Sequence, residues 1–234
     1  MGKTVAIHQP NFFPWLGYFD KIVRSDVFVF FDDVQFPKKG GSWSNRVKML
    51  IGGEAKWITA SIERNYSGLR NINEMKFQAD NWRVKMLKSL RTNYNKNSFY
   101  DETMEVVEPL ILNPEKNVAK YNIQAVTKIL DRLNLKSSGI RLSSEFSFDL
   151  SSNELLCSVT KEVGGNTYMC GGGADGYQEE QIFEDSGIRL EYQNFQHPHY
   201  SQRGSESFEP GLSIIDAAMN IGWEKVSSIL NIPN

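Results

Sequence analysis

The chain has 234 residues, of which 40 % are hydrophobic and 23 % are charged, which is usual for a folded globular protein and unlike a disordered one. The formal net charge of −2 argues against a general attraction to nucleic acid or anionic lipid, because such attraction needs many unpaired cations. The sequence has no apolar run long enough to span a bilayer and no pattern of a secretory signal at its start. We therefore expect a cytoplasmic chain with no nucleic-acid partner and no membrane insertion.

The first part of the chain has a strand, loop, helix, strand pattern. Residues 4–7 form a short apolar run within an expected strand over 4–8, a helix is expected over 16–24, and residues 27–31 are apolar without polar alternation. Such a run is typical of a strand buried on both faces of a parallel sheet. Because His8 and Asp32 come at the ends of these two strands, we expect their side chains to lie beside the same loop edge.

The pattern changes over residues 34–77, where strand-like segments alternate with glycine-rich and polar turns, and this predicts a small antiparallel insertion. The strand-like segments cover residues 46–51, 55–62 and 72–77. Residues 78–135 are predicted to form a helical segment, with apolar residues at three- and four-residue spacing over 81–92, 100–112 and 118–133. On the first of these helices the basic residues are expected to form a solvated face; they are Arg83, Lys85, Lys88 and Arg91.

The last third returns to an alternation of strands and helices. Strands are expected over residues 140–143, 166–170 and 188–192, and helices over 154–163 and 178–185. Ser151 with Glu154 fits a capping box. The whole pattern predicts an α/β fold, in which a mostly parallel central sheet is flanked by helices, as a single domain over residues 1–234.

The loop that follows the first strand holds the leading catalytic candidate. His8 is a candidate general acid or base, because imidazole titrates near neutral pH, although a histidine that caps a strand end is the structural alternative. Gln9 and Asn11 could hold a polar substrate or the imidazole ring, and prolines restrict the loop. Trp15 either stacks on a flat ligand or fastens the first helix to the sheet.

Asp32 could orient His8, accept a proton or simply form the local hydrogen bonds of a turn. No accompanying cluster of histidine and carboxylate side chains indicates a metal at this point. Asn45 and Arg46 follow a loop of lysines and glycines, and an arginine entering a strand suits a bidentate contact with an anion. The alternative is an exposed hairpin tip.

Two further segments are candidates. The glycine-rich loop over residues 170–177 lies between a predicted strand and helix, where backbone amides could hold an anion. Cys170, at its start, is either a nucleophile or a small buried residue. The spacing between Cys157 and Cys170 matches no common zinc pattern, and we expect both thiols to be reduced.

The late segment is the third polar cluster. Tyr200, Gln202 and Glu209 are candidate site residues, with His197 and His199 as weaker candidates. Further along, Ser213 and Asp216 are expected to cap the apolar helix that follows, which gives both a local role.

Three sequence blocks together resemble the WbqC-like protein family: the opening HQPNFFPWLGYFDKI, the following SDVFVFFDDVQF and the late FEPGLSIID. The family is associated with bacterial surface-polysaccharide and O-antigen gene clusters. The resemblance therefore implies an enzyme that modifies sugars, by transfer of an acyl or aminoacyl group to an amino sugar. It marks the following positions: His8, Gln9, Pro10, Asp32, Asn45, Arg46, Tyr200, Gln202, Glu209 and Pro210. One departure is Cys170, which stands in a Tyr-Met-Cys-Gly segment where a Tyr-Leu-Ser-Gly type is expected.

We predict from these observations a transferase whose site residues line one pocket. The predicted catalytic residues are His8, Asp32 and Glu209. The predicted substrate-binding residues are Gln9, Asn11, Trp15, Asn45, Arg46, Cys170, Tyr200 and Gln202. The expected partners are a sugar or nucleotide-sugar substrate and an acyl carrier protein, with no cofactor and no metal. Two alternatives stay open: a nucleotidyltransferase-like enzyme, and a non-catalytic binding subunit of polysaccharide assembly.

Overall fold

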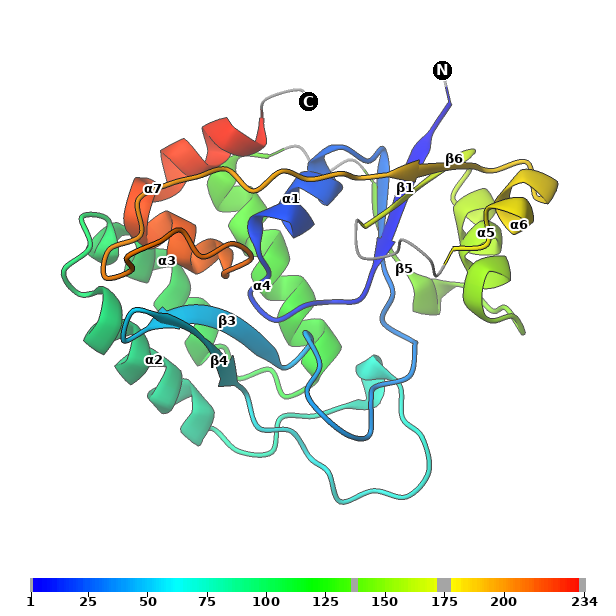
Figure 1. The fold of residues 1–234 in the computed structure, drawn as a ribbon. Helices are drawn as coiled ribbons and strands as arrows, with labels where there is room; N and C mark the ends of the chain where they lie inside the picture. The colour runs from blue at the N-terminus through cyan, green and yellow to red at the C-terminus, as the bar shows by residue number, and fades with distance from the viewer. Residues whose placement is uncertain (1, 136–138, 172–177, 232–234) are drawn as a thin grey trace. The chain divides into compact units, whose positions relative to one another are not determined.

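The computed structural model describes residues 2–135, 139–171 and 178–231 (Figure 1). The chain divides into two compact units. Unit 1 consists of Met1–Gln9, Gly17–Asp33 and Lys136–Gln196, and unit 2 consists of Pro10–Leu16, Val34–Leu135 and His197–Asn234. The chain thus leaves unit 1 directly after Gln9 and returns to it at Gly17.

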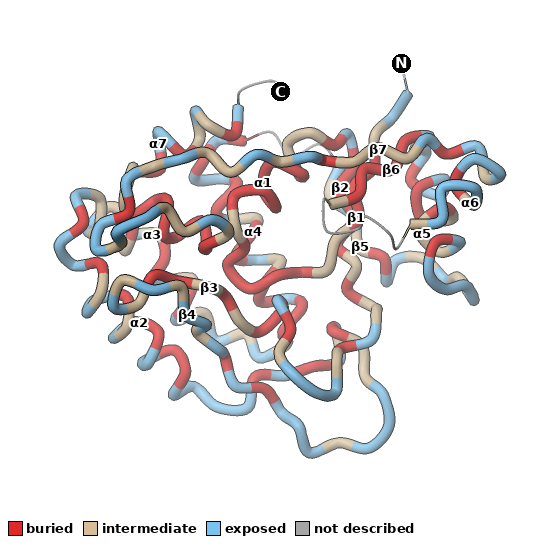
Figure 2. The backbone as a smooth tube through the Cα atoms, in the orientation of Figure 1, coloured by how far each residue is buried: buried red, intermediate tan, exposed pale blue. Residues whose placement is uncertain are grey.

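Unit 1 is built on a five-stranded sheet with the order β5-β2-β1-β6-β7. The strands are β1 (Thr4–His8), β2 (Val27–Phe30), β5 (Gly139–Leu142), β6 (Thr167–Cys170) and β7 (Arg189–Tyr192). All four pairings are parallel. Every residue of β2 and β6 is buried, as expected of inner strands covered on both faces (Figure 2). The predicted α/β fold with a parallel central sheet is confirmed.

The order of the strands reverses at β1. From β1 the chain proceeds to β2 and then to β5 on one side, and it later returns to β6 and β7 on the other side. The two connections that flank the β1–β6 pair therefore lead in opposite directions. In open α/β sheets such a switch point leaves a crevice at the carboxyl ends of the strands, where ligands commonly bind.

Helices pack on both faces of this sheet. They are α1 (Leu16–Val23), α5 (Ser152–Glu162) and α6 (Glu180–Asp185). Ile7, Val29 and Cys157 belong to a hydrophobic cluster shared by the sheet, α5 and α6. On α1, Tyr18 packs edge-on against Phe28 with ring centroids 5.5 Å apart. Alternate residues of each strand thus bury opposite faces.

The capping box predicted for α5 does not form. Ser151 occupies the N-cap position, as the sequence indicates, but its side chain makes no capping hydrogen bond. The following Ser152 has a φ of 50°, so the backbone enters the helix in a conformation unlike that of a regular first turn.

Unit 2 combines a small antiparallel sheet with four α-helices among its described residues. The elements are β3 (Arg46–Ile51), β4 (Glu54–Thr59), the 3₁₀ helix η1 (Ile72–Glu74), α2 (Asn81–Tyr94), α3 (Tyr100–Leu112), α4 (Val118–Leu133) and α7 (Ile214–Leu230). The antiparallel insertion and the helical segment are therefore confirmed. The strand predicted over 72–77 is wrong for Ile72–Glu74, where the Asn71 amide bonds to the Glu74 carboxylate at 2.7 Å at the start of a helical turn, whereas Lys76 and Phe77 form isolated antiparallel bridges.

The proline-rich loop Pro10–Leu16 is fixed inside unit 2. Phe12 lies within an aromatic cluster, with its ring centroid 5.5 Å from that of Trp82 and 6.0 Å from that of Tyr121. The Phe12 amide donates to the Trp43 carbonyl at 2.8 Å. Asn122 in turn donates to the Pro10 carbonyl at 2.8 Å. Phe12 and Phe13 are therefore core residues of unit 2, whereas Trp15 is only half-buried.

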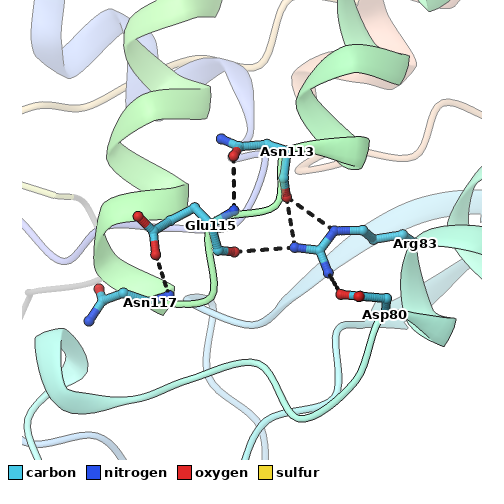
Figure 3. A network of polar contacts seen from close by, with 5 residues as sticks. All are labelled: Asp80, Arg83, Asn113, Glu115 and Asn117. Atoms are coloured by element: carbon cyan, nitrogen blue, oxygen red, sulfur yellow. Dashed lines mark hydrogen bonds and ion pairs between the residues drawn. The ribbon is translucent and has the colours of Figure 1, made fainter.

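Arg83 is the exception to the predicted solvated basic face of α2, on which Lys85, Lys88 and Arg91 are exposed. Its side chain is buried, and its guanidinium donates to the backbone carbonyls of Asn113 and Glu115 and pairs with Asp80 (Figure 3). The guanidinium also lies over the Trp82 ring, 4.5 Å from its centroid. Arg83 therefore ties the start of α2 to the segment between α3 and α4.

Candidate active site

A hollow of about 350 Å³ opens in unit 1 at the carboxyl ends of β1 and β6, which is the switch point of the sheet. It is lined by Ile7, His8, Gln9, Lys21, Phe31, Leu156, Tyr168 and Gly171. Among these residues, His8 and Lys21 supply ionisable nitrogen atoms. The hollow therefore lies where the topology of the sheet favours ligand binding, and two of the side chains that line it can donate or accept a proton.

His8 is the last residue of β1 and lies on the side of the sheet that α1 covers. Its ring packs edge-on against Tyr18, with centroids 4.8 Å apart. Its Nδ1 lies 3.1 Å from the Gln9 carbonyl oxygen. Because a carbonyl oxygen can only accept, Nδ1 carries the proton in this pair, and Nε2 is left with the lone pair. The ring is thus held in the tautomer that can accept a proton at Nε2.

The expectation that His8 titrates near neutral pH is wrong for this arrangement. Burial, followed by the nearby positive charge of Lys21, lowers the pKa of His8 from 6.5 to about 3. The hydrogen bond to the Gln9 carbonyl favours the charged form but does not offset these two effects. At neutral pH the imidazole is therefore neutral.

Lys21 is the site residue that sequence reasoning missed. Its side chain is buried, and Nζ donates to the carbonyl oxygen of Ile7 at 3.2 Å. Burial lowers the pKa of its amine from 10.5 to about 8, against a smaller opposing effect of Cys170. An amine with this pKa holds its proton at pH 7 and can release it about one pH unit higher. The signal in the sequence is a lysine one residue before Ile22 on a short apolar helix, which is too common to identify a site.

Cys170 lies at the end of β6, as predicted, and its thiol is fully buried in the hydrophobic cluster of unit 1. Its Sγ lies 3.4 Å from the Glu191 carbonyl oxygen, to which it donates. This placement favours the small buried residue over the nucleophile. The remainder of the glycine-rich loop, residues 172–177, lies outside the described residues.

Asp32 follows β2 and is buried, but its carboxylate is used to hold the next segment of unit 1. Oδ1 accepts hydrogen bonds from the Ser143 hydroxyl at 3.2 Å and the Ser144 amide at 3.1 Å. Oδ2 accepts one from the Ser144 hydroxyl at 2.8 Å. These contacts support the structural alternative, and orientation of His8 by Asp32 stays a prediction.

Asn11 and Trp15 lie in the anchored loop of unit 2. Asn11 is buried, and its Oδ1 has no hydrogen-bond partner among the described residues. Trp15 forms an isolated bridge with Ser213, and its ring centroid lies 5.0 Å from that of His197. Trp15 thus fastens the loop to the late segment of the chain.

Asn45 and Arg46 begin the hairpin of unit 2. The Asn45 side chain accepts from the Ser42 amide at 3.2 Å and donates to the Ala60 carbonyl at 3.0 Å, so it closes the turn before β3. Arg46 places its guanidinium carbon 4.1 Å from the centroid of the Trp57 ring. Asn45 therefore has a structural role in closing the turn. The positive charge of Arg46 lies against the Trp57 ring.

Tyr200 and Gln202 converge on the buried carboxylate of Asp216, which the sequence assigned only to helix capping. The hydroxyls of Tyr94 and Tyr200 donate to it at 2.7 and 2.8 Å, and the Gln202 amide donates at 3.2 Å. Burial outweighs these hydrogen bonds and raises the pKa of Asp216. The four side chains form a connected polar cluster inside unit 2, which we call the Asp216 cluster.

Glu209 joins the Asp216 cluster through its backbone. Its amide donates to Gln202 Oε1 at 2.7 Å, and its carbonyl accepts from Gln202 Nε2 at 2.9 Å. Ser213 caps α7 as predicted, since its hydroxyl accepts from the Ile215 amide at 3.2 Å. A catalytic role for the Glu209 carboxylate stays a prediction.

The predicted single pocket takes residues from both units, and this grouping stays a prediction. Within unit 1 the structure brings together His8, Gln9 and Lys21, and within unit 2 it brings together Tyr200, Gln202 and Glu209. Among the described residues, no three histidine, cysteine or carboxylate side chains gather closely enough to hold a metal ion. None of the described helices combines the length and the apolar character that crossing a membrane requires.

The fold and the hollow define an α/β protein with a candidate ligand site at the switch point of a parallel sheet. Comparison with known proteins agrees with the resemblance found in the sequence. The model of the WbqC-like protein family matches residues 9–228, a stretch that includes parts of both units, and the chain belongs to this family. A relative from Mycobacterium tuberculosis, the uncharacterized protein Rv1507c, is 27 % identical over 226 residues, which cover 95 % of each chain. No solved structure matches the chain.

Proposed function

We propose that this chain is a cytoplasmic enzyme of bacterial surface-polysaccharide biosynthesis that transfers an acyl or aminoacyl group to a nucleotide-linked amino sugar. The family name supports the link to polysaccharides. The observation that carries the proposal is the hollow at the β1–β6 switch point, where His8 and Lys21 lie together. An acyl carrier protein is the proposed source of the acyl group.

The chemistry of the proposed reaction needs a proton acceptor and a positive charge. As the amine nitrogen of the sugar attacks the acyl carbon, His8 Nε2 takes the amine proton, and the ammonium of Lys21 stabilises the negative charge that develops on the acyl oxygen. The new carbon–nitrogen bond forms as the bond from the acyl carbon to the donor sulfur or oxygen breaks. The departing atom takes the bonding electron pair and then the proton from His8.

The lowered pKa values have defined consequences for this step. An imidazole with a pKa of about 3 is always in its basic form at neutral pH, although it is a weak base in the empty hollow. A negatively charged group of a substrate bound near Lys21 would offset the positive charge that disfavours imidazolium, and so would raise the pKa of His8 when that substrate is present. His8 would then become a stronger base on binding the substrate.

The proposal is tested by incubating the purified chain with nucleotide-linked amino sugars and carrier-bound acyl or aminoacyl donors, and measuring product mass. We expect a mass increase equal to one acyl group, lost when His8 is replaced by alanine in a protein that still folds. If no pair gives product, transfer is contradicted, and consumption of ATP with a nucleotide-linked product would favour the nucleotidyltransferase alternative. A His8→Ala protein that folds and preserves surface polysaccharide in cells would favour the non-catalytic subunit.

A further inference from the structure

The β3–β4 hairpin of unit 2 has two chemically different faces. Side chains alternate between the faces of a strand, and the register pairs Lys48 with Trp57 and Arg46 with Thr59, which places these four on one face. Val47 and Met49, on the opposite face of β3, are buried. The hairpin therefore has one core face, and an outward face that carries two cations and a tryptophan.

Two tryptophan rings are exposed on or beside the outward face of the hairpin, although rings of this size are usually buried. Trp57 is 38 % exposed and Trp43, from the preceding turn, is 40 % exposed. Their ring centroids lie 4.8 Å apart in an edge-to-face arrangement. Figure 2 shows β4 as an intermediate to exposed strand beside the more buried β3. Contiguous exposed aromatic surface of this kind marks a binding site more often than isolated apolar residues do.

Two cations, Arg46 and Lys48, lie beside the Trp57 ring. The Arg46 guanidinium carbon lies 4.1 Å from the ring centroid and Lys48 Nζ lies 5.5 Å from it. Within the described part of the chain no carboxylate forms an ion pair with either cation, whereas Lys56 on the same hairpin pairs with Glu54 at 2.9 Å. A guanidinium stacked by its face keeps N–H donors at its edge for an anion.

We propose that this outward face binds a sugar that carries a negative charge. The C–H groups of a sugar ring are weakly positive and pack on the electron-rich face of an indole, and the adjacent phosphate or carboxylate would lie against Arg46 and Lys48. This inference rests on the proposed function, because it narrows the substrate class to anionic saccharides. The charge could come from a nucleotide diphosphate or from an acidic glycan, and the experiment separates these two sources.

Gly41 supplies a way to move Arg46 without removing it. A Cβ atom at Gly41 would lie 2.5 Å from Nη1 and 2.6 Å from the central carbon of the Arg46 guanidinium. Because the end of an arginine side chain is flexible, Gly41→Ala should displace the guanidinium and leave the fold intact. Gly41→Ala therefore tests whether binding depends on the position of the Arg46 guanidinium, whereas Trp57→Ala tests whether binding depends on the aromatic ring.

The test is isothermal titration of the full chain with three probes: UDP-N-acetylglucosamine, a glucuronate-containing tetrasaccharide and an uncharged N-acetylglucosamine tetrasaccharide. We expect at least one charged probe to bind ten times more tightly than the uncharged one. We expect Trp57→Ala to weaken that binding at least tenfold, Trp57→Phe to weaken it less, and Gly41→Ala to weaken it severalfold. Val84→Ala, at an exposed position on α2, is the control that should leave binding unchanged.

The outcomes separate this inference from the proposed reaction. Tighter binding of the nucleotide sugar points to a donor or acceptor site, and tighter binding of the glucuronate probe points to the growing glycan. Equal binding of the uncharged probe, or unchanged binding by Trp57→Ala, would overturn the inference, as would a dimer that Trp57→Ala dissociates when no probe binds. Binding that depends on Trp57, without any acyl product, would support the inferred binding face and contradict only the proposed acyl transfer.

Discussion

The hollow of unit 1 and the Asp216 cluster of unit 2 both contain polar side chains, but the two regions differ in how far the hydrogen-bonding capacity of those side chains is used. Asp216 accepts three side-chain hydrogen bonds, and Asn220 donates to its backbone carbonyl at 2.8 Å. In the hollow, Lys21 has a backbone carbonyl as its hydrogen-bond acceptor, and its charge lowers the pKa of His8. The Asp216 carboxylate is surrounded by neutral donors, whereas the hollow holds a neutral imidazole beside a buried ammonium.

The comparison shows which feature separates a structural polar cluster from a candidate site. A network of satisfied hydrogen bonds stabilises one arrangement of the chain and leaves few groups to bind a ligand. A buried ammonium beside a neutral imidazole, at the wall of a hollow, favours a ligand that brings negative charge. Substitutions should therefore reduce stability in the Asp216 cluster and activity in the hollow.

The largest expected effect is that of Asp216→Ala on stability. The change leaves the donors of Tyr94, Tyr200 and Gln202 buried without their acceptor, so the free energy of unfolding should fall by roughly 3–5 kcal/mol. Urea denaturation measures this loss. Tyr200→Phe removes a single donor and should cost only about 1 kcal/mol. An Asp216→Ala protein of normal stability that forms no product would instead place Asp216 in the active site.

The second effect is the reverse case, a loss of activity without a loss of stability. Lys21→Met removes the cation that would stabilise the acyl oxygen, and product formation should fall by about 100-fold or more. Methionine fills a similar volume and removes a charge whose burial is unfavourable, so the melting temperature at pH 7 should not fall. Lys161→Met, at an exposed position of α5, is the matched control. Normal product formation by Lys21→Met would show that the hollow is not the catalytic site.

The sequence predicts those features of the two regions that depend on a pattern within one short segment of the chain. The continuous apolar run over residues 27–31 predicts the inner strand β2, because such a run is itself the signature of a strand covered on both faces, and the short run before His8 predicts β1. The parallel pairing of β1 with β2 and of β6 with β7 then follows from the single helix that joins each of these two pairs. The position of His8 at the edge of the sheet was predictable for this reason.

The rest depends on tertiary packing that no local pattern contains. Lys21 and Arg83 look like the polar residues of ordinary amphipathic helices, yet both are buried, because a backbone carbonyl from another element lies within reach of each. Asp216 sits where a helix-capping residue is expected, and its partner Tyr94 lies 122 positions earlier in the chain. Such partners are set by the fold, so the sequence alone assigned these residues the commoner local role.

The third expected effect is a pH dependence of stability caused by His8. The unfolded imidazole binds a proton below about pH 6.5, whereas the folded one binds it only near pH 3, so the unfolded state holds more protons between these values. Stability should therefore fall as the pH falls from 6.5 toward 3. His8→Gln should reduce this loss by about 1–3 kcal/mol, allowing for the part of the ring that faces solvent. Denaturation at pH 7 and pH 4 measures it, with the exposed His199→Gln as control.

The smallest expected effect is that of Cys170→Ser, which introduces the serine that the family pattern suggests. The thiol is buried in an apolar cluster and donates to a backbone carbonyl, so a hydroxyl should cost about 1 kcal/mol of stability. Product formation should change less than about threefold, because the sulfur is not among the atoms that line the hollow. Cys170→Ala should behave in the same way. Loss of product in both variants, with the melting temperature preserved, would make Cys170 the nucleophile and extend the site from the hollow into the strand beneath it.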